Sequence, residues 1–262
     1  MIIKNSQIRA KARHLLDDNI LGKDWLKSVI INLMTMFIVG TTGGALIFIS
    51  NKFLVTFLLE RFGGFAPILA YVIPIVLDVL ELLALNIFIG PLNVGLASVH
   101  LDLVRGNGSL KIRRFFDGFK NFFDNFQIGF MYMLHIALWS LLLVIPGIYM
   151  SYTYALVFHV KKDNPDYRWQ QCFDESERLM EGNRWRLFKL QLSFIGWYLL
   201  GGIALFGLGS LWVTPYQEVS TAIFYEEVKK ARDLNPVVTD PNHRVTTDPV
   251  IVDLTNKGIF GK

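Results

Sequence analysis

Two acidic residues lie close together within a long apolar part of this sequence. Asp78 and Glu81 are three positions apart, so a helix would place both on one face. Carboxylates inside a membrane span are costly and are therefore candidates for function. A pair of this kind could line a path for a cation or a proton. The alternative is that both acids lie at the outer rim of the membrane, in contact with headgroups and water.

Further polar residues follow this pair along the chain. Asn86, Asn93 and His100 are spaced seven residues apart, which places them on an adjoining stripe of the same predicted helix. For the two asparagines, the alternative role is hydrogen bonding between helices that fixes their packing. His135 lies in the next predicted span, where a hydrogen-bonded core position is the alternative. The candidate polar seam consists of Asp78, Glu81, Asn86, Asn93 and His135.

The elements that must carry these residues are membrane-spanning helices. The chain has 262 residues, of which 52% are hydrophobic and only 18% are charged, a balance too apolar for a soluble domain. About 20 apolar residues span the hydrocarbon core, so a charge-free run of that length predicts one span and a longer run predicts a hairpin. Two runs of each kind predict six spans, and these runs are 28–51, 82–101, 125–160 and 190–217.

The distribution of Lys and Arg predicts the orientation of these spans. Basic residues are retained on the cytoplasmic side of a membrane. Alternate segments between the spans contain 24 of the 26 basic residues, namely 1–27, 101–127, 161–189 and the region from 226 onward. We therefore predict an all-α, polytopic bundle of six transmembrane helices in the cytoplasmic membrane, with both termini in the cytoplasm.

Two basic, amphipathic segments are predicted to lie in the cytoplasmic interface. Phe residues recur at three- and four-residue spacing between 108 and 126, beside Lys, Arg and Asp residues, and the N-terminal segment shows a weaker pattern. Both could contact anionic lipid, or both could be ordinary span ends that pack against neighbours. The predicted organisation is an amphipathic segment at 1–24, a six-span domain at 25–233 and a disordered cytoplasmic tail at 234–262.

Proline and glycine mark the predicted outer turns, one at Pro146-Gly147 and one around 207–209. The run Thr214-Pro215-Tyr216-Gln217 has the pattern of a helix start, with an N-cap, a first-turn proline and a capping-box glutamine. Such a start would place Glu218 in the first turn, where the positive end of the helix favours a carboxylate. Capping is then the alternative to a role of Glu218 in transport.

A cationic and aromatic collar is predicted where the fifth span meets the cytoplasmic face. Arg184, Trp185, Arg186 and Lys189 lie there close together in the sequence. Positive and indole side chains are typical anchors at a membrane interface. A functional collar would bind anionic lipid headgroups or phosphate-bearing ligands, and the alternative is an ordinary helix end.

Motifs for catalysis, cofactors and metals are not found in the sequence. It contains no phosphate-binding loop with its lysine, no nucleophile elbow and no zinc-protease helix motif. The five histidines are scattered, and the single cysteine, Cys172, is a poor start for a metal site. We predict no catalytic residue, no cofactor and no metal, which leans against an enzyme. The net charge of +4 is explained by the topology, so nucleic acid is not a predicted partner.

The chain resembles a known family of bacterial membrane proteins. The most specific part is Ser193-Phe194-Ile195-Gly196-Trp197, and Gly90-Pro91-Leu92, Ile145-Pro146-Gly147-Ile148 and Pro215-Tyr216 fit the same pattern. These residues resemble the domain-of-unknown-function family 975 over roughly residues 5–230. The resemblance implies a six-span bundle typical of Gram-positive bacteria, distantly similar to membrane domains found beside glycerophosphodiester phosphodiesterases. It supplies no reaction, substrate or catalytic residue.

Three classes of function follow from these observations. The leading hypothesis is a non-enzymatic accessory protein that acts through contacts with membrane lipids, or with another membrane protein, at its basic and Phe-rich inner face. The alternative is a transporter or channel for a small solute, ion or lipid that uses the polar seam. The third is an intramembrane enzyme acting on lipid headgroups, for which the sequence shows no convergent acid, base and nucleophile. The sequence does not predict the oligomeric state.

Overall fold

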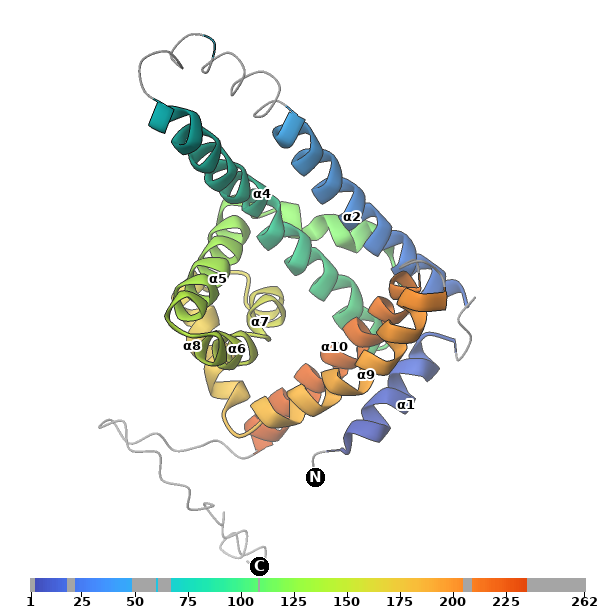
Figure 1. The fold of residues 1–262 in the computed structure, drawn as a ribbon. Helices are drawn as coiled ribbons and strands as arrows, with labels where there is room; N and C mark the ends of the chain where they lie inside the picture. The colour runs from blue at the N-terminus through green and yellow to red at the C-terminus, as the bar shows by residue number, and fades with distance from the viewer. Residues whose placement is uncertain are drawn as a thin grey trace, which may run out of the picture.

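The computed structural model describes residues 3–17, 22–48, 60, 67–107, 109–204 and 209–234 (Figure 1). Every regular element formed by these residues is a helix, which confirms the predicted all-α class. Residues 235–262 of the predicted tail lie outside the described part of the chain. In chain order, the helices are α1 (Asn5–Leu15), α2 (Lys23–Phe48), α4 (Pro67–Val104), the 3₁₀ helix η2 (Ile112–Phe119), α5 (Phe122–Leu142), α6 (Val144–Thr153), α7 (Val157–Asp163), α8 (Trp169–Met180), α9 (Arg184–Ala204) and α10 (Ser210–Leu234).

Three of the described helices are long and apolar enough to cross a membrane. The qualifying segments are Lys23–Gly43 of α2, Ile87–Val104 of α4 and Phe122–Leu142 of α5. They differ in their surroundings, because 67% of the α4 segment is buried within the protein against 22% for α2 and 17% for α5. Helix α4 is therefore the central helix, while α2 and α5 turn most of their apolar surface outward.

The region predicted as the fourth span consists of two short helices. A turn separates α6 from α7, and the amide of Val157 donates to the carbonyl of Tyr154 across it at 3.2 Å. The ten residues of α6 extend about 15 Å, which is half of the hydrocarbon thickness. A single continuous helix over this region is therefore not observed.

The turn before α6 lies earlier than predicted. Leu143 has an extended backbone and separates α5 from α6, so the prediction of a turn at Pro146-Gly147 was wrong in position. Pro146 is the third residue of α6, where its missing N–H costs nothing because first-turn amides have no partner within the helix. Gly147 faces Ser140 so closely that a Cβ at this glycine would collide with it.

Glycines allow α4 to pack closely against η2 and α5. A Cβ on Gly90 would collide with the backbone of α5 at Asn125, and a Cβ on Gly118 would collide with the carbonyl of Pro91. Small residues at such contacts let backbones approach and gain van der Waals attraction. Phe115 of η2 is completely buried in this contact region. One face of the Phe-rich segment therefore packs on α4.

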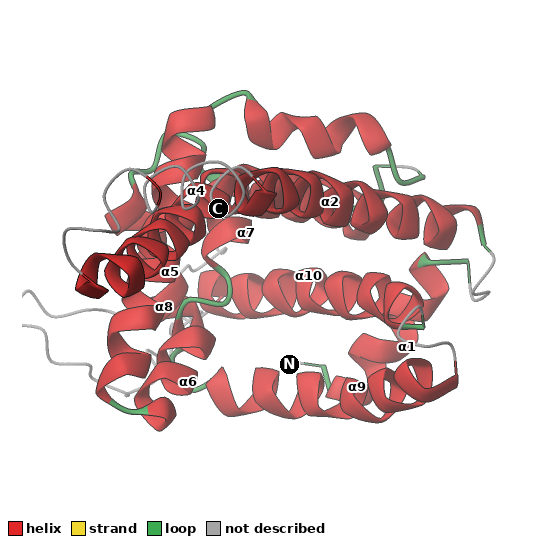
Figure 2. Ribbon diagram, turned by 45° about the horizontal axis from the view of Figure 1, so that its top comes forward, coloured by secondary structure: helices red, strands yellow, loops and turns green. Residues whose placement is uncertain are grey.

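In Figure 1, the α9–α10 hairpin crosses the direction of α2 and α4 at a steep angle. Its two helices lie side by side in Figure 1 and in Figure 2. At the junction, the indole Nε1 of Trp25 in α2 donates to the carbonyl of Trp212 in α10 at 3.0 Å. A six-span arrangement with the N-terminus inside would put these two helix starts on opposite sides of the membrane. The described helices are therefore not one set of parallel spans, and the span count and orientation remain predictions.

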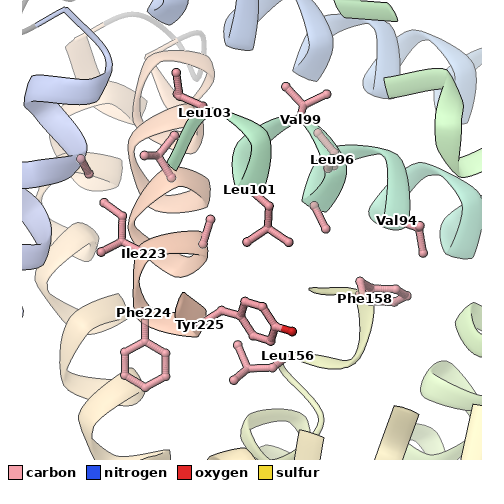
Figure 3. Packing of buried hydrophobic residues seen from close by; sticks show 14 of the residues in the cluster. Val94, Leu96, Val99, Leu101, Leu103, Leu156, Phe158, Ile223, Phe224 and Tyr225 are labelled. Atoms are coloured by element: carbon pink, nitrogen blue, oxygen red, sulfur yellow. The ribbon is translucent and has the colours of Figure 1, made fainter. Parts of the chain in front are cut away.

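The apolar core is centred on the C-terminal half of α4. Figure 3 shows Leu101 of α4, Tyr225 of α10 and Leu156 gathered between these helices. All three side chains are buried, as are Ile223 and Phe224 of α10. Burial of each such side chain contributes about 1.5–3 kcal/mol. This packing fixes the position of α10 and α7 against α4, which in turn positions the polar groups described next.

Candidate functional site

A cavity of about 290 Å³ lies among α4, α5, α6, α7, α9 and α10. Because residues from six helices meet at its wall, the cavity is a product of tertiary packing. Its aromatic wall is formed by Tyr132, Tyr152 and Phe158. Its polar wall consists of Asn93, Ser151, His159, Gln191, Gln217, Glu218 and Thr221.

Within the described part of the chain, Glu218 is the only Asp, Glu, Lys or Arg in the cavity wall. Its side chain is half-buried, and no hydrogen bond or ion pair to it is found within the described residues. The predicted helix start at Thr214 was wrong, because α10 begins at Ser210 and contains Pro215 in its interior. Thr214 instead donates its hydroxyl to the Ser210 carbonyl at 2.8 Å. Glu218 therefore lies about two turns into the helix, where capping does not explain it.

The amides of the cavity wall are only partly satisfied by the protein. Asn93 donates Nδ2 to the carbonyl of Ile89 at 2.8 Å, within its own helix. The Oε1 atom of Gln217 accepts a hydrogen bond from the hydroxyl of Tyr198 at 2.7 Å. The described residues supply no partner for the carbonyl oxygen of Asn93, so this acceptor is available to a ligand.

Two buried histidines lie near the same junction. His159 lines the cavity, is 6% exposed, and its Nδ1 has no hydrogen-bond partner among the described residues. Its ring lies 5.4 Å from that of Tyr225. His100, 1% exposed, contacts the hydroxyl of Ser28 through Nε2 at 2.9 Å. A buried nitrogen without a partner is costly, and the Nδ1 of His159 is buried too deeply to face the cavity.

A charged cluster joins α4, α7 and α10 beyond the cavity. Arg105 contacts Asp163 at 2.8 Å and Glu226 at 2.6 Å. Asp163 also accepts hydrogen bonds from Lys229 and from the hydroxyl of Tyr225, the latter at 2.9 Å. Burial alone would raise the pKa of Asp163, but the hydrogen bonds from Lys229, Arg105 and Tyr225 outweigh burial and hold this pKa below its usual value. The cluster neutralises its own charges.

The structure separates the described members of the predicted polar seam. Asn93 lines the cavity. His135 does not, because its ring packs 5.1 Å from Phe173 of α8 and its Nδ1 lies 2.8 Å from the carbonyl of Met131. The backbone of α4 includes Asp78, Glu81 and Asn86, but the side chains of these three residues lie outside the described part of the structure.

The four residues of the predicted collar point in two directions. Arg184 donates Nε to the hydroxyl of Thr153 at 2.9 Å, and Arg186 donates to the carbonyl of Ile3. Both arginines therefore tie parts of the protein together. Trp185 is 63% exposed, and the ammonium of Lys189 lies 5.4 Å from its ring centroid. The outward-facing part of the collar is the pair Trp185 and Lys189.

Sequence reasoning missed the role of Glu218 and the cluster around Asp163. One sequence signal for Glu218 existed, since it is the only charged residue between Lys189 and Glu226. The local resemblance to a capping box obscured this signal. For Asp163 no signal was available, because Arg105 and Glu226 are distant from it in the sequence and only the fold brings them together.

Helices of this length and apolarity, arranged around a partly polar interior, are typical of the membrane class of all-α proteins. Residues 131–232, from the middle of α5 to the end of α10, match the family described as "Protein of unknown function (DUF975)". This match confirms the resemblance to that family, over a shorter range than the sequence pattern predicted. No curated protein and no solved structure matches the chain. Within the described residues, no group of three or more His, Cys, Asp and Glu side chains could hold a metal ion.

Proposed function

We propose that the chain is a non-enzymatic accessory protein of the cytoplasmic membrane that acts through lipid contacts at its inner face. The single observation that carries this proposal is one outward face of α9. It begins with the paired Trp185 and Lys189 and continues with Leu192, Ile195 and Leu199, which are 49 to 62% exposed. An indole and an ammonium followed by an apolar strip match a headgroup layer followed by acyl chains.

The α5–α6 turn supports insertion into lipid. Leu141 and Ile145 are 86% and 80% exposed, and the intervening side chains are exposed to a similar degree. Each such side chain that stays in water loses roughly 1.5–3 kcal/mol of stabilising free energy relative to a buried one. Contiguous apolar surface of this kind marks a membrane or protein contact.

The charged cluster around Asp163 supports a common side for three basic segments. Arg105, Asp163 and Lys229 come from regions that the Lys and Arg distribution assigns to the cytoplasm. Their contact is what a multi-pass protein with these regions on one side would require. The proposed localisation is the cytoplasmic membrane, with the basic segments and both termini inside.

The experiment is reconstitution of the full chain in nanodiscs with brominated lipids that quench tryptophan fluorescence. We expect brominated phosphatidylglycerol to quench more than brominated phosphatidylcholine, and the difference to shrink in Trp185→Phe and in Lys189→Gln. Lys230→Gln, an exposed lysine at the end of α10, is the matched control. Equal quenching by both lipids in the wild type would refute headgroup selectivity.

A second candidate function is the transporter or channel predicted as the alternative. The cavity lined by Asn93 and Glu218 is the observation that favours it. Flux of a solute across proteoliposomes, abolished by Glu218→Gln, would establish transport over the accessory role.

A further inference from the structure

Among the described residues, the carboxylate of Glu218 has no counter-charge in the cavity. None of them adds a Lys or Arg to the cavity wall, and none gives Glu218 a hydrogen bond. Removing a carboxylate from water without a partner is costly, and ionisable groups among apolar helices mark functional sites. Within the described residues, Glu218 therefore has no positive partner.

The cations of the cluster around Asp163 are already neutralised. Arg105 and Lys229 are both engaged with Asp163, and Arg105 also contacts Glu226. Glu226 is eight residues from Glu218, which corresponds to about 12 Å along the helix. These basic residues therefore balance their own acids, and none of them is left to pair with Glu218.

The aromatic wall determines which cation fits. Tyr132 and Phe158 have ring centroids 5.2 Å apart, and Tyr152 completes the wall. Aromatic faces attract ammonium groups through their quadrupoles, and cages of this kind bind substituted ammonium ions. The volume of about 290 Å³ equals that of roughly ten water molecules, which is far more than a bare metal ion needs.

A neutral acceptor complements the carboxylate. The carbonyl oxygen of Asn93 has no partner among the described residues. It can accept a hydrogen bond from an N–H or an O–H group of a ligand. From these groups together, we infer that the cavity binds a small organic ammonium ion, with Glu218 as its counter-charge and the aromatic wall around its alkyl groups. This site is independent of the lipid contacts of α9.

The test measures choline binding to the full chain in nanodiscs by isothermal titration calorimetry. Loss of one member of a desolvated charge pair costs 2 kcal/mol or more, so Glu218→Gln should weaken binding about 30-fold or more. Glu177→Gln removes an exposed carboxylate of α8, outside the cavity, and should leave binding unchanged. Choline affinity of Glu218→Gln within twofold of the wild type would overturn the proposal.

A second comparison needs no variant and is valid even if Glu218→Gln does not fold. The uncharged carbon isostere of choline, 3,3-dimethylbutanol, has the same shape without the positive charge. We expect it to bind the wild type at least about tenfold more weakly, since each 1.4 kcal/mol of lost attraction is a factor of ten. Equal binding of both compounds, or no choline binding at all, would overturn the proposal.

The ammonium group can come from a free amine or from a lipid headgroup. Nanodiscs of phosphatidylethanolamine and of phosphatidylglycerol distinguish these sources. Weaker apparent choline binding in phosphatidylethanolamine supports occupation by an aminolipid headgroup. Equal choline binding in the two lipids supports a free amine as the ligand of the same site.

Discussion

Asp163, at the end of α7, lies 2.8 Å from Arg105, just beyond the end of α4. The carboxylate is nearly buried, with 6% of its side chain exposed, whereas about a third of the arginine side chain is exposed. Lys229 and Tyr225 of α10 bind the same carboxylate. This single acid therefore holds together three helices that also form the cavity.

Replacing Asp163 by Asn should destabilise the fold. The change leaves Arg105 and Lys229 without their shared partner, and breaking a largely buried ion pair costs about 2–4 kcal/mol after allowance for the exposed arginine. The apparent free energy of unfolding, measured by SDS titration in mild detergent, should fall by this amount. Asp166→Asn, an exposed acid in the next loop, is the control and should change stability little.

The same acid should make stability depend on pH. Its pKa in the folded protein is lowered by the hydrogen bonds that it accepts. A carboxylate with a lowered folded pKa contributes stability that is complete above its unfolded pKa of about 3.9 and is lost as the pH falls through the folded value. The wild type should therefore lose stability in acid below about pH 4, with a steeper slope than Asp163→Asn. Parallel pH profiles would contradict this assignment.

Two glycines within helices should respond oppositely to alanine. Gly90→Ala brings a Cβ into the backbone of α5 at Asn125 and Gly129, so we expect a loss of about 1–3 kcal/mol from overpacking. A Cβ on Gly40 of α2 meets nothing within 4 Å, and alanine there gains up to about 1 kcal/mol of helix propensity. Thermal unfolding followed by circular dichroism compares the two. Equal effects would contradict the close packing of α4 on α5.

The thiol of Cys172 should react slowly with maleimide. It is completely buried in α8, and burial raises its pKa to about 11, with only a small opposing effect of Lys161. Because the thiolate is the reactive form, maleimide labelling at pH 7.5 should proceed far more slowly than labelling of the SDS-unfolded chain. A Cys introduced at the exposed Ser6 in a Cys172→Ser background is the control and should label rapidly.

The helices could be predicted from the sequence because charge-free runs and hydrophobic spacing are local properties. The break in the helix after Thr153 could not be predicted, since Tyr154-Ala155-Leu156 contains neither proline nor glycine. This break results from packing against α4 and α8. The crossing of α9 and α10 over α2 is likewise a tertiary property, set by contacts such as Trp25 with Trp212. Apolar runs predict where helices form, but not their directions.

The candidate site was predictable only in part. Asn93 was singled out from its place in an apolar helix, and it lines the cavity. Glu218 and Gln191 come from other helices, far from Asn93 in the chain, so no sequence spacing relates them. The Pro215 pattern also assigned Glu218 a local role that the true start of α10 removes. A lone acid in an apolar run was the stronger signal.

The attachment of α1 gives a last prediction. Asn5 donates Nδ2 to the carbonyl of Arg186 at 3.0 Å, while the guanidinium of Arg186 donates to the carbonyl of Ile3. Replacing Arg186 by Gln removes a charge-assisted hydrogen bond worth about 1.5–3 kcal/mol. The N-terminal helix should then detach more often, and trypsin should cleave after Lys11 or Arg13 roughly ten times faster or more, since 1.4 kcal/mol is a tenfold change.

Membrane vesicles of known orientation turn this cleavage into a test of topology. If the N-terminus is cytoplasmic, Arg186→Gln should be cleaved in inside-out vesicles and protected in right-side-out vesicles. Lys189→Gln is the matched control, because this exposed residue of the same helix lies over the ring of Trp185 and should cleave like the wild type. Cleavage in right-side-out vesicles only would place α1 outside and reverse the orientation predicted from the basic residues. Cleavage of Lys189→Gln as fast as Arg186→Gln would instead show that the hydrogen bonds of Arg186 do not hold α1 in place.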